Sequence, residues 1–226
     1  MKSCAVIAAA GSGSRMGGVS KPNIVIAEKT LFEYVLGAFG ASCVGELVIV
    51  CSEDNETSLR ALASGFEKPI CFVRGGKTRA ESVFLGVCAS SKDASIICTH
   101  DCARPFISPE TINKAVNAAI EKGASCVCAP VTDTVKIKNA DGTVSTPDRS
   151  RLFAVQTPQC FKKELYLSAK ALSGEAYLSF TDETSLLEAG GYAVEYIINS
   201  ENNMKLTSKS DVPLAEAIMK NIIQKR

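Results

Sequence analysis

The sequence predicts an α/β fold: a doubly wound, mostly parallel β-sheet with helices on both faces and a projecting β-arm. Short apolar segments alternate along the chain with amphipathic helical segments, as in parallel sheets whose strands are joined by helices. One polar stretch with a strong turn signal interrupts this alternation. The chain has 226 residues, 46% of them hydrophobic, and no linker divides it. We therefore expect a single domain over residues 1–226.

Six segments have the apolar character of buried strands. They are Cys4–Ala9, Glu46–Cys51, Pro69–Val73, Ser95–His100, Ser125–Pro130 and Tyr192–Asn199. Continuous apolar runs of this length are typical of parallel strands that are covered on both faces.

Helix starts are expected between these strands. They lie at Thr30–Glu33, Thr78–Glu81, Ser108-Pro109, Thr181 and Ser210. The first two have the spacing of a capping box, in which an N-cap hydroxyl pairs with a Glu three residues later. Ser108 followed by Pro109 is typical of an N-cap and the first helical residue. The helix from Thr181 is expected to end at Gly190-Gly191.

The polar stretch Asp133–Phe153 interrupts the alternation. It contains Asn139-Ala140-Asp141-Gly142, and Asp-Gly is a strong hairpin signal. We expect two short strands that form an arm, because the segment has too little apolar content for a core of its own. Either the arm packs on a second subunit or it is a plain surface hairpin.

Charge and cysteine content exclude several classes of protein. Lys and Arg total 25 against 24 Asp and Glu, so a protein that coats nucleic acid or an acidic membrane is disfavoured. No apolar run reaches the roughly 18 residues of a membrane span. The ten cysteines include no C-x-x-C pair, and only one histidine is present, which disfavours a zinc site. We expect reduced core thiols and a cytoplasmic location.

The segment Ala8–Gly17 joins the first expected strand to a glycine-rich loop. Glycines such as Gly11 and Gly13 allow main-chain N–H groups to approach a phosphate. The loop lacks the Lys-Ser/Thr of a Walker A motif, and Met16 stands where a dinucleotide-binding loop needs its third glycine. Arg15 and Lys21 add two cations, which suits a polyphosphate ligand.

A second group of polar residues follows the strand Ser95–His100. Ligands of open α/β sheets gather at the carboxyl ends of strands. Asp101 is suited there to a hydroxyl or Mg²⁺, and Arg104 to a phosphate. For His100 we expect a structural hydrogen-bonding role. No G-x-S-x-G motif is present, which disfavours a serine hydrolase.

Arg79 and Ser82 lie at the start of an expected helix, where N–H groups favour an anion or the polar edge of a base. Four further segments carry scattered polar residues. They are Asp133–Lys136, Asp148-Arg149, Gln156–Gln159 and Asn203–Lys205. Singly, none of them identifies a site.

Taken together, these motifs resemble the 2-C-methyl-D-erythritol 4-phosphate cytidylyltransferase family over nearly the whole chain. The motifs follow in order at Ala9–Met16, Lys21-Pro22, Arg79–Val83, His100–Pro105, Pro130–Lys136, Asp148–Leu152, Gln156–Gln159 and Asn203–Lys205. Two departures stand out. Cys102 replaces the commoner alanine, and residues 199–202 lack the glycine often found there.

The resemblance implies a Rossmann-like fold and transfer of the cytidylyl group of CTP to 2-C-methyl-D-erythritol 4-phosphate, with Mg²⁺ or another divalent cation whose protein ligands are unknown. It implies that Arg15, Lys21, Arg149 and Lys205 are catalytic. The nucleotide-binding residues would be Ala9, Ala10, Gly11, Gly13, Gly76, Arg79, Ser82 and Asp101. The acceptor-binding residues would be Asp101, Arg104, Thr134, Arg149, Thr157 and Lys205. It also implies a homodimer in which the arm carries Arg149 into the neighbouring subunit's site.

Two other functions remain open at this point. A D-ribitol-5-phosphate cytidylyltransferase would share the glycine-rich loop, the His100–Pro105 motif and the arm. A non-catalytic nucleotide-binding regulatory subunit would need the loop, but it would have no reason to keep Lys21, Arg149 and Lys205 together.

Overall fold

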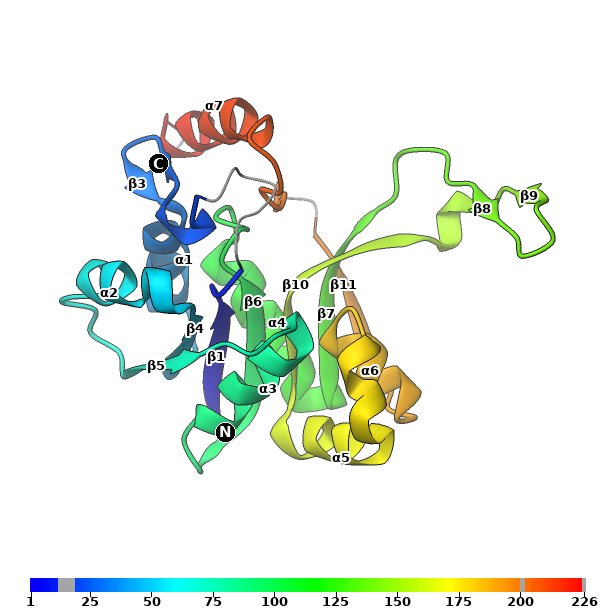
Figure 1. The fold of residues 1–226 in the computed structure, drawn as a ribbon, viewed down its shortest axis with the longest axis horizontal. Helices are drawn as coiled ribbons and strands as arrows, with labels where there is room; N and C mark the ends of the chain where they lie inside the picture. Colours follow the sequence, from blue (N-terminus) through cyan, green and yellow to red (C-terminus); the bar gives the residue numbers. More distant parts are fainter. Residues whose placement is uncertain (12–18, 200–201, 225–226) are drawn as a thin grey trace.

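A computed structural model describes residues 1–11, 19–199 and 202–224 of the chain (Figure 1). Its main sheet has the strand order β11-β7-β10-β6-β1-β4-β5. The strands are β1 (Lys2–Ala8), β4 (Glu46–Cys51), β5 (Ile70–Arg74), β6 (Ala94–Asp101), β7 (Ala124–Pro130), β10 (Phe153–Lys162) and β11 (Glu195–Ile198). β10 runs antiparallel to both neighbours, whereas the other neighbouring pairs are parallel. The predicted mostly parallel sheet is confirmed.

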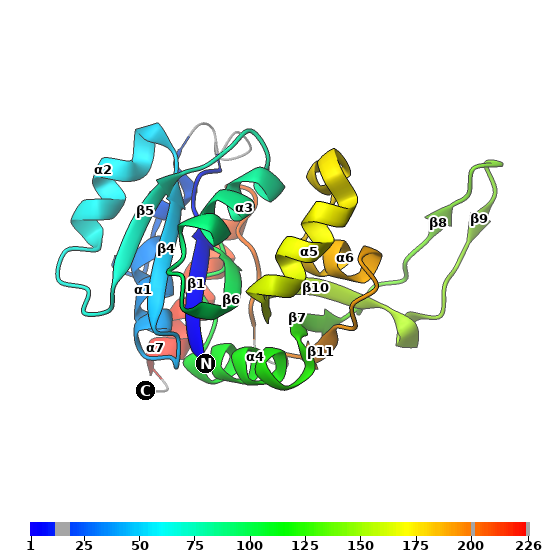
Figure 2. The same ribbon diagram turned by 90° about the horizontal axis from the view of Figure 1, so that it is seen from below.

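Helices cover both faces of this sheet (Figure 2). They are α1 (Leu31–Gly40), α2 (Glu53–Leu62), α3 (Arg79–Ala89), α4 (Pro109–Lys122), α5 (Lys163–Ser173), α6 (Glu183–Ala189) and α7 (Asp211–Gln224). Short 3-10 turns are η2 (Lys21–Asn23), η3 (Arg149–Arg151) and η4 (Gly174–Ser179). One buried cluster joins α1, α2 and α4 to the sheet, and a second joins α3, α5 and α6 to the opposite face. No described helix is long and apolar enough to cross a bilayer.

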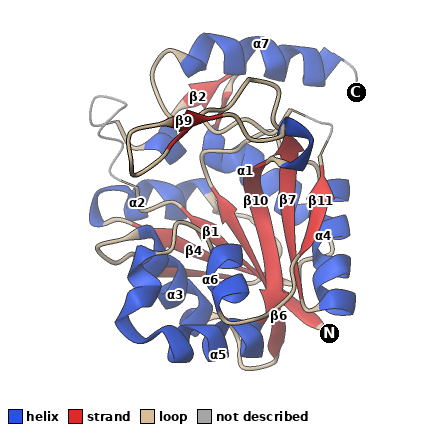
Figure 3. Cartoon of the chain, turned by 90° about the vertical axis from the view of Figure 1, so that its right-hand side faces the viewer, coloured by secondary structure: helices blue, strands red, loops and turns tan. Residues whose placement is uncertain are grey.

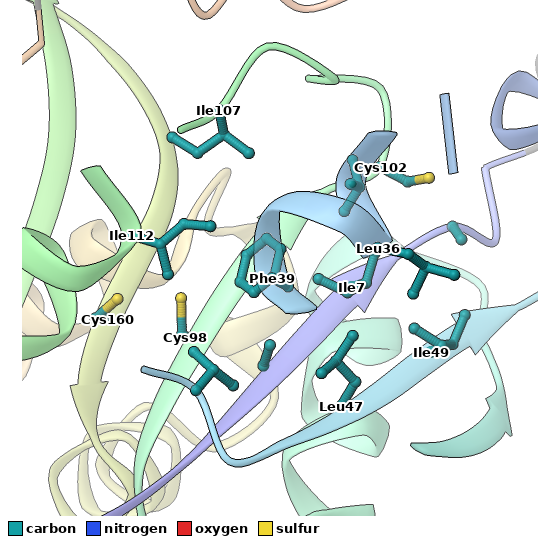
Figure 4. Packing of buried hydrophobic residues seen from close by; sticks show 14 of the residues in the cluster. Ile7, Leu36, Phe39, Leu47, Ile49, Cys98, Cys102, Ile107, Ile112 and Cys160 are labelled. Carbon is teal, nitrogen blue, oxygen red and sulfur yellow. The ribbon is translucent and has the colours of Figure 1, made fainter. Parts of the chain in front are cut away.

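Alternating side chains of the central strand β1 belong to the two buried clusters. Ala5 and Ile7 pack with the α1 side, whereas Cys4 and Val6 pack with the α3 side. Figure 4 shows Ile7 beside Phe39 of α1 in the first cluster. This two-sided burial explains why the strand is continuously apolar.

The strand order changes direction at the carboxyl end of β1. β1 pairs with β4 on one side and with β6 on the other, and Ala8 of β1 lies opposite Asp101 of β6. The chain runs from β1 to β4 and β5 on one side of β1 and then returns to β6 on its other side, so the strand order reverses at β1. Open α/β sheets bind ligands at such a topological switch point. The first residues after Asp101 therefore lie beside the end of β1, and Cys102 donates its N–H to the main-chain oxygen of Ala8 at 3.1 Å.

The arm is the hairpin of β8 (Ile137–Lys138) and β9 (Val144–Ser145), and it extends away from the sheet (Figures 1 and 2), toward the viewer in Figure 3. Gly142 adopts a φ of 84°, which the hairpin loop requires and glycine tolerates. The predicted hairpin is confirmed. A second small hairpin, β2 (Val25–Ile26) with β3 (Lys29–Thr30), precedes α1.

Two of the predicted helix starts are correct in detail. Thr30 forms the full capping box with Glu33, and Ser108 accepts the N–H of Thr111 in front of Pro109.

Two others need correction. Thr78 caps α3, but the Glu81 carboxylate accepts the N–H of Lys77 at 2.6 Å, so this is no reciprocal capping box. The N-cap of α6 is Asp182, not Thr181, because the Asp182 carboxylate accepts the N–H of Ser185 at 2.8 Å. A carboxylate is especially favourable at a helix start because of the helix dipole.

All ten cysteines lie within the described residues and are free thiols. Seven are buried, which agrees with the expected core thiols, but Cys43, Cys71 and Cys88 are exposed. Cys71 is exposed because β5 is the edge strand of the sheet.

Candidate functional site

Asp101, the last residue of β6, is the centre of a charged cluster. Arg79 approaches Oδ1 with its Nε at 3.1 Å, and Lys205 approaches Oδ2 with its Nζ at 2.7 Å. The Nε of Arg104 lies 3.8 Å from Oδ2. Motifs that are more than 100 residues apart in the sequence therefore meet at one carboxylate.

The cations around Asp101 keep this buried carboxyl group ionised. Burial by itself raises its pKa, but Arg79 and then Lys205 outweigh that effect and hold the pKa of Asp101 well below its usual range. Only 6% of Asp101 is exposed. The site thus keeps a hydrogen-bond acceptor with a fixed negative charge at neutral pH.

Glu183, the first residue of α6, is a second buried carboxylate of the cluster. Its two oxygens accept from NH1 and NH2 of Arg79, at 2.6 and 3.2 Å. It also accepts the hydroxyl proton of Thr99 at 2.8 Å. Sequence analysis missed Glu183, because an acidic residue at the start of a helix is common and needs no further explanation.

His100 organises the backbone at this site. Its Nε2 lies 3.1 Å from the main-chain oxygen of Arg104, which can only accept, so Nε2 carries the proton. Nδ1 then accepts the hydroxyl proton of Thr157 at 3.0 Å. The same hydroxyl accepts the N–H of Asp101 at 3.1 Å. Burial lowers the pKa of His100 to about 4, which favours the neutral ring that these bonds require.

Asn203 joins the Lys205 segment to the rest of the site. Its side-chain amide donates to the main-chain oxygen of Thr157 at 2.8 Å and to Oε1 of Gln156 at 3.0 Å. Its own main-chain oxygen accepts from NH1 of Arg104 at 2.8 Å. Three of the predicted motifs are therefore in direct contact. Sequence analysis had given Asn203 and Gln156 no role beyond their motifs.

Several predicted nucleotide-binding residues lie together where β1 and β5 end. Ala9 continues β1 by donating its N–H to Val50 at 2.8 Å. The N–H of Gly76 donates to the Ser82 hydroxyl at 3.0 Å. A Cβ added at the adjoining Gly75 would lie 2.6 Å from Cβ of Ala10, so glycine allows these two loops to approach closely. Gly11 follows, with its main chain exposed.

Lys21 lies at the start of η2, and its Nζ donates to the main-chain oxygen of Leu206 at 3.2 Å. It is therefore held beside the segment that carries Lys205. Gly13 and Arg15, also predicted from the sequence, lie outside the described residues.

Thr134 and Arg149 are not brought to the Asp101 cluster within one chain. Both are exposed at the base of the arm, where NH1 of Arg149 donates to the main-chain oxygen of Thr132 at 2.7 Å. Thr134 and Arg149 could contribute to a site of this kind only if the arm lay beside it, for example beside the site of a second subunit.

The described residues contain no grouping of three or more His, Cys, Asp or Glu side chains that would form a metal cage. What they offer is a set of cations, Lys21, Arg79, Arg104 and Lys205, near the carboxyl ends of β1 and β6. Such an arrangement is suited to bind phosphate groups and to stabilise negative charge that develops on them.

Comparison with known proteins agrees with this chemistry. Residues 3–221 match the model of the family described as IspD, 2-C-methyl-D-erythritol 4-phosphate cytidylyltransferase. A protein of that name from Clostridium novyi (strain NT) is 37% identical over 98% of both chains, and one from Alkaliphilus oremlandii (strain OhILAs) is 36% identical over 97% of this chain and 95% of its own.

Solved structures support the same assignment. The structure of 4-diphosphocytidyl-2C-methyl-D-erythritol synthase from Anaerococcus prevotii DSM 20548 superposes with a TM-score of 0.86 at 29% identity, covering 97% of this chain and 98% of that one. The 2-C-methyl-D-erythritol 4-phosphate cytidylyltransferase from Thermus thermophilus gives a TM-score of 0.78 at 28% identity, covering 97% and 100%. The chain belongs to the 2-C-methyl-D-erythritol 4-phosphate cytidylyltransferase family.

Proposed function

We propose that this chain transfers the cytidylyl group of CTP to 2-C-methyl-D-erythritol 4-phosphate in isoprenoid precursor biosynthesis. The products are 4-diphosphocytidyl-2-C-methyl-D-erythritol and pyrophosphate. The observation that carries this proposal is the meeting of Arg79, Arg104 and Lys205 at Asp101, at the switch point of a sheet in a chain of this family.

In this reaction an oxygen of the acceptor phosphate attacks the α-phosphorus of CTP, and the bond to the bridging oxygen of pyrophosphate breaks. Two polyanions must approach each other, and negative charge builds up at the α-phosphorus. We assign Arg15 and Lys21 to stabilise that charge, because fixed cations act most strongly where charge develops in the transition state. Lys21 is already held toward the site by Leu206.

For the nucleotide, we assign main-chain and small-residue contacts. Ala9, Ala10, Gly11 and Gly13 would bind through the glycine-rich loop, and Gly76, Ser82 and Arg79 through the start of α3. The close approach of Ala10 to Gly75 supports a narrow slot lined by backbone, which suits the flat cytosine ring and its polar edge.

For the acceptor, we assign Arg104 and Lys205 to its phosphate and Asp101 to a hydroxyl of the sugar alcohol, with Thr157 and Thr134 beside them. The depressed pKa of Asp101 supports this role, since an ionised carboxylate accepts a hydroxyl proton and rejects a second phosphate. The hydroxyl of Thr157 donates to His100, so toward a ligand it can only accept.

A divalent cation, with Mg²⁺ as our proposal, would accompany CTP. Mg²⁺ in proteins commonly binds one or two carboxylates together with phosphate oxygens. Asp101 fits as a single carboxylate ligand, but Arg79 and Lys205 already occupy its oxygens, so phosphate oxygens would supply most of the coordination. When bound, the cation would neutralise triphosphate charge.

We propose that the active form is a homodimer in which the arm carries Arg149 to the acceptor phosphate in the neighbouring subunit. The exposed position of Arg149 on an arm that extends away from its own sheet supports this (Figure 2). We also propose a single domain over residues 1–226. Ten free cysteines support a location in the reducing cytoplasm.

The test is an assay of purified protein with CTP and each acceptor, with pyrophosphate release and the mass of the product as readouts. We expect turnover with 2-C-methyl-D-erythritol 4-phosphate, no turnover with D-ribitol 5-phosphate, and loss of activity when a chelator removes divalent cations. Preference for ribitol phosphate, or CTP binding without transfer to either acceptor, would contradict the proposal.

A further inference from the structure

We propose that Glu183 is a positioning residue that acts on cytidylyl transfer through Arg79. The inference rests on the proposed function, because Arg79 is one of the assigned nucleotide contacts. Glu183 itself is only 3% exposed and is paired on all sides by protein groups. Its effect on a ligand must therefore pass through the side chain that it holds.

Side chains from two strands of the sheet hold Glu183 in position. Oε1 of Gln159, on β10, accepts the main-chain N–H of Glu183 at 2.9 Å and that of Thr184 at 3.1 Å. Thr99, on β6, donates its hydroxyl to Oε2 of Glu183 at 2.8 Å. The start of α6 is thus fastened to two neighbouring strands, and the carboxylate has one orientation available.

This carboxylate in turn fixes Arg79. The planar fork of the guanidinium meets both oxygens of Glu183 with NH1 and NH2, while Nε turns to Asp101. A bidentate pair sets the rotation of the guanidinium plane as well as its position. The side chain of Arg79 remains 29% exposed, so N–H groups of the fork that are not used by Glu183 can reach a ligand.

Arg79 needs this support because it is the first residue of α3. A cation at a helix start faces the positive end of the helix dipole, so Arg79 is disfavoured there by its own helix. Two carboxylates, Asp101 and Glu183, compensate for this. Without Glu183 the guanidinium keeps Asp101 as its remaining carboxylate, and it would rotate toward that residue and compete with Lys205 for its oxygens.

A double-mutant cycle tests the inference. We compare the native protein with Glu183→Gln, Arg79→Met and the double variant, and measure kcat, the KM for each substrate and the thermal midpoint. The matched control is Glu188→Gln, which removes another carboxylate from α6, one that contacts Tyr196 and not the cluster. All variants are checked for folding by circular dichroism.

We expect Glu183→Gln to raise the KM for CTP about tenfold or more while kcat stays within about threefold, and Glu188→Gln to change neither. In the Arg79→Met background, Glu183→Gln should change kcat/KM for CTP less than about twofold, since the residue that it positions is gone. If Glu183→Gln fails to fold, Glu183→Asp, which keeps the charge but shortens the reach, runs the same cycle.

Equal losses in the two backgrounds would show that Glu183 acts independently of Arg79 and would overturn the inference. Unchanged kinetics in Glu183→Gln would overturn it as well. A native protein that transfers no cytidylyl group would instead refute the proposed function, so the two failures can be told apart.

Discussion

Acidification should destabilise this protein through one residue, His100. It is the single histidine of the chain, it is fully buried, and the pKa of His100 is lowered to about 4 by that burial. In the unfolded chain its pKa is about 6.5. Below pH 6.5 the unfolded state therefore binds a proton that the folded state refuses, and the free energy of unfolding falls as the pH falls.

The magnitude follows from the two pKa values. Each pKa unit corresponds to about 1.4 kcal/mol, so between pH 7.5 and pH 4.5 the loss should be about 2.5 kcal/mol, with about 1.4 kcal/mol already lost at pH 5.5. Carboxyl groups whose pKa is lowered in the folded protein, such as Asp101 and Asp211, also make the free energy of unfolding fall in acid. Their loss begins only near the pKa of the unfolded groups, about 4, so the window from 6.5 to 4.5 reports mainly on His100.

The assay is urea unfolding at pH 7.5, 6.5, 5.5 and 4.5, with His100→Asn as the comparison. At pH 7.5 the variant should be less stable by about 1–3 kcal/mol, because Thr157 and the carbonyl of Arg104 lose their partner. Across the window its stability should be nearly flat. An equal decline in the native protein and in His100→Asn would refute the assignment of the acid sensitivity to His100.

Three further outcomes are expected. Lys21→Ala and Arg15→Ala should each lower kcat about 10²–10³-fold and weaken CTP binding far less, because each removes a charge that acts at the transition state. Steady-state kinetics with a separate binding titration checks this, and near-normal turnover in both variants would contradict it. Arg149→Ala and Lys21→Ala proteins, each with strongly reduced activity on its own, should regain partial activity when mixed and allowed to exchange subunits, and no recovery after confirmed exchange would argue against a shared site. Lys68→Met should lower the free energy of unfolding by about 1–3 kcal/mol with unchanged kinetics, because the ammonium donates to three main-chain carbonyls at and just beyond the end of α1, at 2.7–2.9 Å. Urea unfolding measures the loss, and full stability in the variant would contradict the prediction.

The sheet was largely predictable because its strands are buried on both faces. β1 and β4 are both continuous apolar runs. The bounds of β4 were predicted correctly, and those of β1 differ by two residues at its start and one at its end. β10 was missed because Gln156, Pro158 and Gln159 interrupt its apolar pattern. Gln159 is buried all the same, since α6 supplies the N–H groups that its side chain accepts. Such a partner becomes known only after the chain folds.

The site was predictable to the extent that its residues carry an unusual signal. In the sequence, Asp101 and Arg104 follow the expected strand Ser95–His100. Arg79 is a cation at a helix start, and a capping box does not explain a cation there. Glu183 carries no such signal, because an acidic residue is ordinary at that position. The tautomer of His100 was equally out of reach, because a carbonyl and a hydroxyl from separate segments determine it.

The two buried carboxylates explain how a chain of net charge +1 can prepare a site for two polyanions. Three described cations, Arg79, Arg104 and Lys205, would repel one another if they met in an empty crevice. Asp101 and Glu183 hold them in place before any ligand arrives, at the cost of occupying part of their hydrogen-bonding capacity. The Nε of Arg104 is buried without a hydrogen-bond partner among the described residues and lies 3.8 Å from Oδ2 of Asp101. Under the proposed function, we expect Lys205 to change from Asp101 to a bound phosphate, because its side chain is more exposed than that of Arg104 and Asp101 is its single carboxylate partner in the described part of the chain.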